Sequence, residues 1–196
     1  MIKSRTRFYF IRHGETELNK LGLYSGSTNI PLNEMGRLQA QAAAKWLRAH
    51  PIKSIAASPL LRAFETASII GQQIGIEPVV IHELQECHLG VMERQPHQGT
   101  WPEYAHKWRS GFTFEEGEPF EDFRNRVVRA VDQALALEGP VLVVAHGAFG
   151  MALGHALGHE HVSFDNAVPH HIEPHEKYEH GWRIAPLAKH DFDESA

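Results

Sequence analysis

Short apolar runs alternate with longer helical segments along this chain, and this alternation constrains the fold more than any other feature. The runs are rich in aromatic and β-branched residues, as buried strands are. They cover residues 7–11, 52–58, 77–82 and 139–147, with weaker candidates at 167–172 and 182–187. Strands that alternate with helices pair into a largely parallel sheet with helices on both faces. We therefore predict an α/β fold, a three-layer α/β/α sandwich around a mostly parallel sheet of about six strands.

The predicted helices show apolar periodicity and typical start signals. In residues 34–49, Leu38, Ala42 and Trp46 recur every four positions, which is typical of the apolar face of an amphipathic helix. Asn33 precedes this helix as a suitable N-cap. The other helices are predicted at residues 59–74, 104–109, 120–137 and 148–157.

The bulk composition fits a single domain over residues 1–196, since no linker or repeat divides the chain. A net charge of -5 with dispersed basic residues argues against nucleic acid or an anionic membrane as partner. The apolar stretch 8–11 is too short for a signal peptide, so we expect a cytoplasmic location. The single cysteine, Cys87, excludes an intrachain disulfide. We expect the acidic end, 191–196, to be frayed, and the oligomeric state stays open.

Chemically active side chains stand at the ends of three predicted strands. Arg12 and His13 end the first strand, Arg62 lies about one helical turn beyond the second, and His146 ends the run 139–147. The carboxyl ends of parallel strands meet at one sheet edge, where ligands of such folds bind. Arginine matches phosphate oxygens, and a neutral imidazole is a competent nucleophile toward phosphorus. Each residue alone is more often structural, but their joint placement favours an anion site.

The backbone at these strand ends also suits an anion. Gly14 and Gly147 each follow a histidine, where a glycine permits a tight turn and close approach of a ligand. Ser58 followed by Pro59 is a typical N-cap and first helical position. Helix N-termini after Ser58 and Gly147 would add partial positive charge beside a bound phosphate.

Four motifs resemble the signatures of the histidine phosphatase superfamily, in its phosphoglycerate-mutase-like branch. They are RHGETELN (12–19), SPLLRAFETA (58–67), LQECHLG (84–90) and VVAHG (143–147). The segment SGSTNIPLNEMGRLQA (25–40) is also similar to the family, so the resemblance spans most of the chain. It implies the phosphoglycerate-mutase-like fold and chemistry on phosphate esters.

The resemblance also implies residue roles. His13 would be the nucleophile that becomes phosphohistidine, and Glu86 would be the proton donor. Arg12, Arg62 and His146 would bind the phosphoryl group and stabilise its charge. The remaining implied substrate contacts are Asn19, Ser25, Gly26 and Gly147.

The choice of the acid depends on its environment. A leaving alkoxide needs a proton, and a carboxylic acid with a raised pKa can donate it. The nearby cations would lower the pKa of Glu86, so we expect burial or the substrate phosphate to keep it protonated. Glu83 and Glu93 are the alternative donors. This chemistry needs no metal, and we expect no cofactor.

A cap-like insert, residues 91–119, departs from the family pattern. Residues 92–94 read Met-Glu-Arg where many members have Trp-Glu-Gly, and residues 117–119 read Gly-Glu-Pro where Gly-Glu-Ser is common. Mutases of the family have longer and more basic caps. The basic residues here are Arg94, Lys107 and Arg109. We therefore predict hydrolysis of a small phosphorylated metabolite, with phosphoglycerate mutase activity as the alternative.

A histidine-rich region raises an alternative of another class. The histidines are His155, His159, His161, His170, His171, His175 and His180. His155 and His159 have the i, i+4 spacing of a ligand pair near a helix end. No cysteine accompanies them, and glycine and proline interrupt the region, so we predict no metal site. A catalytically inactive binding protein is disfavoured because the nucleophile and both arginines are present.

Overall fold

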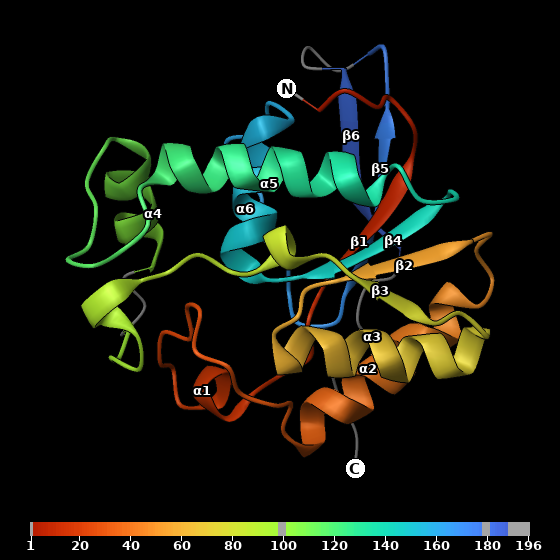
Figure 1. Ribbon diagram of the computed structural model, residues 1–196, viewed down its shortest axis with the longest axis horizontal. Coiled ribbons are helices and arrows are strands. Elements are labelled where there is room, and N and C mark those ends of the chain that lie inside the picture. Colours follow the sequence, from red (N-terminus) through yellow and green to blue (C-terminus); the bar gives the residue numbers. More distant parts are fainter. Residues whose placement is uncertain (1, 98–100, 178–180, 188–196) are drawn as a thin grey trace.

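The centre of the molecule is one six-stranded sheet in the order β3-β2-β4-β1-β5-β6 (Figure 1). The computed structural model describes residues 2–97, 101–177 and 181–187. Its strands are β1 (Phe8–Arg12), β2 (Ser54–Ala57), β3 (Pro78–Val80), β4 (Val141–Ala145), β5 (Pro169–Pro174) and β6 (Trp182–Pro186). β1 to β4 pair in parallel, while β5 is antiparallel to β1 and β6 to β5. The predicted mostly parallel sheet is therefore confirmed as a mixed sheet with one reversed strand.

Helices cover both faces of this sheet, which confirms the α/β/α sandwich. They are α1 (Glu17–Lys20), α2 (Glu34–Leu47), α3 (Leu61–Ile74), α4 (Trp101–Arg109), α5 (Phe120–Ala134) and α6 (Gly147–Ala156). α2 and α3 lie on one face, and α5 and α6 on the other (Figure 1). Two 3₁₀ turns, η1 (His82–Leu84) and η2 (Gly90–Met92), belong to the long segment between β3 and α4.

β4 explains why the longest apolar run of the chain forms a central strand. Its residues are all buried, and they alternate between the two cores. Val141 and Val143 pack with the α5–α6 layer, whereas Leu142 and Val144 pack with the α2–α3 layer. A strand covered on both faces needs apolar side chains at every position. The run therefore has no polar alternation.

α2 buries a different face from the one its periodicity suggested. Leu38 is 50% exposed and Trp46 is 49% exposed. The buried residues are Gly36, Ala40, Ala43, Ala44 and Leu47. The small side chains face the core because they let the helix backbone approach closely: a Cβ on Gly36 would lie 2.1 Å from the Glu15 carbonyl oxygen.

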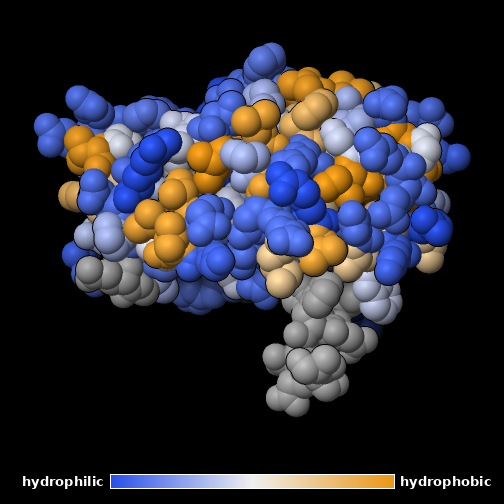
Figure 2. Space-filling model, turned by 90° about the horizontal axis from the view of Figure 1, so that it is seen from below, coloured by the Kyte–Doolittle hydropathy of each residue, from blue (hydrophilic) through white to orange (hydrophobic). Residues whose placement is uncertain are grey.

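On the surface of the molecule seen from below, apolar side chains form separate patches among hydrophilic ones (Figure 2).

Two other helix starts differ from the sequence-based expectation. α3 begins at Leu61, and its N-cap is Leu60 rather than Ser58. The Ser58 hydroxyl instead reaches His146, as described below. α1 was not predicted, although Thr16 and Asn19 form its capping box by reciprocal hydrogen bonds. This Thr-x-x-Asn pattern resembles the usual Ser/Thr-x-x-Glu signal, so the helix start was readable in principle.

The insert packs on the α5 layer through aromatic residues. Trp108 is 1% exposed, and its ring centroid lies 5.2 Å from that of Phe120 and 5.4 Å from that of Phe123.

None of the helices in residues 2–97, 101–177 and 181–187 combines the length and apolar character needed to cross a bilayer. The acidic end, 191–196, lies outside the described residues.

Candidate active site

His13 lies at the carboxyl edge of the sheet, immediately after β1. Its backbone N–H donates to the Ala145 carbonyl at 3.0 Å, so the parallel pairing of β1 with β4 continues through it. The ring Nδ1 lies 2.7 Å from the Gly14 carbonyl oxygen, which can only accept a hydrogen bond. Nδ1 is therefore protonated, and Nε2 keeps its lone pair. Nε2 accepts a hydrogen bond from the Arg62 Nε at 3.1 Å.

The surroundings keep the His13 ring neutral. Its side chain is almost fully buried. Burial lowers the pKa of His13 well below its ordinary value, and the positive charges of Arg62 and Arg12 lower it further. A neutral imidazole whose Nε2 is unprotonated is the nucleophilic form.

Arg62 extends from the first turn of α3 and is fully buried. One Nη donates to the Thr28 carbonyl at 2.7 Å and the other to the Gly26 carbonyl at 2.8 Å. These two bonds and the contact with His13 hold the guanidinium in one orientation. Burial lowers the pKa of Arg62 to about 10, so the group stays charged at neutral pH.

Glu93 holds the loop that carries those two carbonyls. Its Oε1 accepts the Ser27 backbone N–H at 2.9 Å and the Ser27 hydroxyl at 2.8 Å, while Oε2 accepts the Thr28 hydroxyl. Partial burial raises the pKa of Glu93, but the bonds from Thr28 and Ser27 outweigh it, and the pKa lies below its ordinary value. Glu93 is thus an ionised loop anchor. Its Oε1 would lie 2.5 Å from a Cβ on Gly26, which explains the glycine there.

Glu86 is the carboxyl group that faces the arginines. Its oxygens accept the backbone N–H groups of Ala148 and Phe149, each at 2.9 Å, at the N-terminus of α6. Burial raises the pKa of Glu86, and the N–H groups and arginines oppose this rise. Burial therefore has a larger effect on the pKa of Glu86 than the arginines and N–H groups have, and burial was one of the two causes that we expected to keep this group protonated. Glu83 lies elsewhere, with its carboxylate 3.0 Å from Arg129 and 2.8 Å from Gln133.

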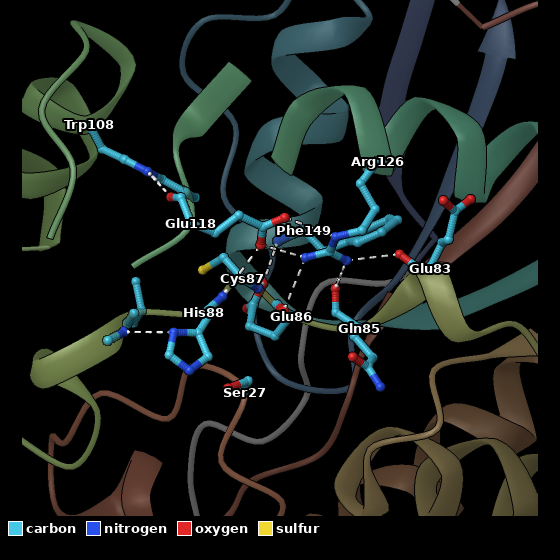
Figure 3. A network of polar contacts seen from close by, with 12 residues as sticks. Ser27, Glu83, Gln85, Glu86, Cys87, His88, Trp108, Glu118, Arg126 and Phe149 are labelled. Atoms are coloured by element: carbon cyan, nitrogen blue, oxygen red, sulfur yellow. Dashed lines mark hydrogen bonds and ion pairs between the residues drawn. The ribbon is translucent and has the colours of Figure 1, made fainter. Parts of the chain in front are cut away.

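Arg126 of α5 supports the backbone that carries Glu86 (Figure 3). Its guanidinium donates to the carbonyls of Glu83 at 3.0 Å, Gln85 at 2.7 Å and Glu86 at 3.3 Å. It also forms a two-point ion pair with Glu118, at 2.6 and 3.0 Å. The backbone of the acid is thus tied to both α5 and the insert.

Arg12 and His146 complete the cationic and imidazole groups around His13. Arg12 donates to the Phe164 carbonyl at 3.1 Å, and its buried Nε has no partner among the described residues. The His146 Nε2 lies 2.8 Å from the Ser58 hydroxyl, and its ring centroid lies 5.3 Å from that of His13. Burial, and then Arg62, lower the pKa of His146 well below its ordinary value.

The two predicted glycines at the strand ends have different neighbours. A Cβ on Gly147 would lie 3.3 Å from the Arg12 Nε, so this glycine leaves room for the guanidinium. A Cβ on Gly14 would lie 2.3 Å from the Gly36 carbonyl oxygen. Gly14 therefore permits close packing of α2, and it is not among the residues that line the cavity.

Two polar residues that the sequence analysis missed support His13. The Asn166 amide donates to the His13 carbonyl at 2.8 Å and lies 3.4 Å from the Asn19 oxygen. The Thr66 hydroxyl accepts the Gly14 N–H at 3.1 Å and donates to the Arg62 carbonyl at 2.7 Å. Thr66 stands inside a recognised motif, whereas Asn166 had no signal beyond a polar residue preceding a strand candidate.

One cavity of about 310 Å³ brings most of the predicted residues together. Eight of them line it: Arg12, His13, Asn19, Ser25, Gly26, Arg62, Glu86 and Gly147. The ninth, His146, lies against the His13 ring. The cavity also has an unpaired buried donor, the Arg12 Nε, and an unpaired buried hydroxyl, that of Ser25. Such groups suit a bound oxyanion, because it would give both of them a partner.

The described histidines of the histidine-rich region, which exclude His180, do not all lie at one place in the fold. In the described ranges, no group of three or more histidine, cysteine, aspartate or glutamate side chains could hold a metal ion. α6 ends at Ala156, so His155 and His159 do not share a helix face as their spacing suggested. His170 bonds to the Val168 carbonyl at 2.9 Å, and His171 stacks on Tyr9. His180 lies outside the described residues.

Comparison with known proteins identifies the family. A family model described as "Histidine phosphatase superfamily (branch 1)" matches residues 8–183. The chain belongs to this superfamily. It is 35% identical over 155 residues to a probable phosphoglycerate mutase, GpmB, of Yersinia pestis, with 74% of this chain and 70% of that protein covered. The predicted family and its enzymatic, phosphatase character are thereby confirmed.

Solved structures of phosphatases are similar over nearly the whole chain. A mycobacterial glucosyl-3-phosphoglycerate phosphatase in complex with VO3 superposes with a TM-score of 0.78 at 28% identity, covering 92% of this chain and 97% of that one. A putative alpha-ribazole-5'-P phosphatase of Escherichia coli K-12 superposes with a TM-score of 0.78 at 25% identity, covering 95% and 97%. This histidine phosphatase therefore has the fold of structurally characterised phosphatases.

Proposed function

We propose that this histidine phosphatase hydrolyses a small phosphomonoester through a phosphohistidine at His13, without a metal. The observation that carries the proposal is the placement of the His13 ring: Nδ1 lies 2.7 Å from the Gly14 carbonyl oxygen, and Nε2 lies 3.1 Å from the Arg62 Nε, so the tautomer with the lone pair on Nε2 is the one that fits. A phosphoryl group that approaches the arginine therefore meets the nucleophile at the same place. The cavity of about 310 Å³ suits a small metabolite.

The reaction proceeds in two balanced steps. In the first, His13 Nε2 forms a bond to phosphorus while the ester P–O bond breaks, and the leaving alkoxide takes the proton of Glu86. In the second, ionised Glu86 accepts a proton from water as the water oxygen attacks phosphorus. The P–N bond breaks, and inorganic phosphate leaves. Arg12 and Arg62 stabilise the charge on the phosphoryl oxygens in both steps.

The insert favours hydrolysis over mutase activity. A mutase must hold a second anionic group of its bisphosphorylated intermediate. Lys107 instead pairs with Glu103 at 2.7 Å, and Arg109 donates to the Glu160 carbonyl at 3.1 Å. Arg94 is exposed, and none of the three lines the cavity. The likeness to a probable phosphoglycerate mutase keeps that activity as the second candidate.

The decisive assay measures phosphate release from p-nitrophenyl phosphate in the presence of a chelator. We expect turnover by the native protein, none by His13→Ala, and full turnover by the control variant His106→Ala. His106 is exposed on α4 and does not line the cavity. An alkaline quench should show one added phosphoryl group on the peptide that contains His13.

Two results would overturn this proposal. One is full activity in a folded His13→Ala variant, which would exclude His13 as the nucleophile. The other is interconversion of 2- and 3-phosphoglycerate that is faster than phosphate release from either. That result would replace hydrolysis by mutase activity as the function of the same site.

A further inference from the structure

The cavity is lined by two groups of side chains with different chemistry. Arg12, His13, Arg62 and Glu86 are the ionisable groups around which the phosphoryl group would lie, and we call them the floor. The second group is aromatic and aliphatic, and we call it the aromatic mouth: Leu23, Tyr24, Leu89, His97 and Trp101.

Backbone pairing between two distant segments builds this mouth. The Tyr24 N–H donates to the Gln95 carbonyl at 3.0 Å, and the Arg94 N–H donates back to the Tyr24 carbonyl at 2.7 Å. The His97 N–H donates to the Gly22 carbonyl at 3.0 Å. The loop after α1 and the start of the insert are therefore paired through their main chains, and this pairing fixes the backbone at Tyr24 and His97.

Ring contacts make the mouth rigid as well as apolar. The Tyr24 ring centroid lies 5.9 Å from that of Trp101, 5.6 Å from that of His97 and 6.1 Å from that of Tyr104. Trp101 also packs against Trp108, at 6.4 Å. Tyr24 is 5% exposed, whereas Trp101 is partly exposed. Trp101 thus lines the cavity with a partly exposed ring that its neighbours already hold in place, so a ligand could contact it at little conformational cost.

The mouth contains no fixed positive charge. Among the described residues that line the cavity, Arg12 and Arg62 are the only lysines or arginines, and both belong to the floor. Three of the donors of Arg62 are bonded to His13, Thr28 and Gly26. A carboxylate or second phosphate on the leaving group would therefore lose water against aromatic side chains without gaining a cation. Such burial of an unpaired charge is strongly unfavourable.

We propose that the aromatic mouth selects phosphomonoesters of uncharged, ring-bearing alcohols and disfavours those with a second anionic group. This proposal rests on the proposed hydrolase function and names its substrate class. The ring of the alcohol packs on Trp101, with Leu23 and Leu89 completing the apolar contact. Removal of ring and apolar surface from water drives this contact, whereas a second anion gains nothing there.

The test compares three phosphate esters of primary alcohols: benzyl phosphate, glycerol 3-phosphate and 3-phosphoglycerate. The alcohol part of benzyl phosphate is an uncharged ring, that of glycerol 3-phosphate has neither a ring nor a charge, and that of 3-phosphoglycerate carries a carboxylate. All three esters are assayed at the same pH. We expect kcat/KM for benzyl phosphate to exceed that for glycerol 3-phosphate about tenfold, as expected for one stacked ring. 3-Phosphoglycerate should have the lowest value.

Two variants test whether the mouth causes this order. Trp101→Ala should reduce the preference for benzyl phosphate over glycerol 3-phosphate about tenfold. Leu23→Lys places a cation in the mouth and should raise kcat/KM for 3-phosphoglycerate relative to benzyl phosphate. Trp46→Ala is the matched control, since Trp46 is 49% exposed on α2 and does not line the cavity. It should leave all three values unchanged.

The outcomes separate this proposal from the one it rests on. If 3-phosphoglycerate is hydrolysed as well as benzyl phosphate, and His13→Ala abolishes both reactions, the hydrolase function stands and the substrate class is wrong. An unchanged preference in a folded Trp101→Ala variant would also overturn the role of the mouth. If the native protein hydrolyses p-nitrophenyl phosphate but none of the three esters, the hydrolase function stands and the substrate class is wrong. If it releases phosphate from none of the four, both proposals fail.

Discussion

In the proposed mechanism, His13 becomes a nucleophile through its neighbours rather than through a dedicated base. The Gly14 carbonyl holds the proton on Nδ1, and burial together with two arginines keeps a second proton off Nε2. The same arginines would bind the phosphoryl oxygens. One pair of cations therefore has two effects at the residue scale: it lowers the pKa of the nucleophile and it stabilises the transition state.

Replacement of Glu86 tests the acid at the same scale. Glu86→Gln should lower kcat for an alkyl ester by about 10²–10³, because an alkoxide needs a proton to leave. Hydrolysis of p-nitrophenyl phosphate should fall much less in the first step, since p-nitrophenolate leaves unprotonated. Release of the alcohol or of p-nitrophenolate in a single turnover reports the first step alone, whereas phosphate release also depends on the second step, in which Glu86 is the base for both esters. Glu83→Gln is the control, and an equal loss of the first-step rate for both esters would contradict the acid role.

The pH dependence of that reaction has a definite sign. Burial raises the pKa of Glu86, so its acid form persists to higher pH than that of an exposed carboxyl group. Activity toward alkyl esters should therefore fall as pH rises through this pKa. The falling limb should be absent in Glu86→Gln, because the amide does not titrate.

Arg94 provides a stability prediction. Its φ of 65° lies in the left-handed region, which costs an L-residue with a side chain about 1 kcal/mol relative to glycine. Arg94→Gly should therefore raise the free energy of unfolding by up to about 1 kcal/mol in urea titrations. Gly75→Ala is the reverse control, since Gly75 has a φ of 77° and open space around it. It should lower the free energy of unfolding by a similar amount.

At the scale of elements, two helices hold Glu86, the proposed catalytic acid, from opposite ends. The N-terminus of α6 binds the Glu86 carboxyl oxygens, and Arg126 of α5 binds the backbone carbonyls around it. Glu118 of the insert pairs with the same arginine, so the acid and the insert share one support (Figure 3).

Removal of this support should act on catalysis as well as on stability. We expect Arg126→Ala to lower kcat for alkyl esters more than it changes KM, because Glu86 loses its position while the phosphoryl floor remains. Arg126→Lys should restore activity only partly, since an ammonium cannot reproduce the two-point pairing. Arg129→Ala is the matched control on α5; Arg129 forms an ion pair with Glu83, and its side chain is 58% exposed. Equal kcat in the Ala variant and the native protein would contradict a positioning role.

At the scale of the whole molecule, the buried histidines link catalysis to acid stability. Burial lowers the pKa of both His13 and His146 in the folded protein. The unfolded chain therefore binds more protons below the ordinary histidine pKa, and stability must fall as pH drops through about 6.5. Each histidine contributes a slope of up to about 1.4 kcal/mol per pH unit below that point.

Urea unfolding at pH 7 and pH 5 measures this slope. His13→Asn should show a shallower loss of stability on acidification than the native protein. His106→Asn, at an exposed position on α4, should leave the slope unchanged. A native protein that is equally stable at both pH values would contradict the linkage.

Most helices and strands were predicted from local sequence patterns. β4 was recognised because a strand buried on both faces must be apolar throughout, and α3 because its helical pattern ends at Gly75. The face of α2 was predicted wrongly. Its large apolar residues were assumed to be buried, whereas close packing against Glu15 required the small ones, and no local pattern contains that distance.

For the site, the sequence by itself determined which side chains the family chemistry needs and that they end parallel strands. Only the tertiary structure decided what supports them. Asn166 bonds to His13 across 153 positions, and Arg126 to Gln85 across 41. Motifs record short spacings, whereas these contacts exist only after the sheet brings distant segments to one edge. The aromatic mouth also depends on the tertiary structure, because the insert must pair with the loop after α1 to bring its residues together.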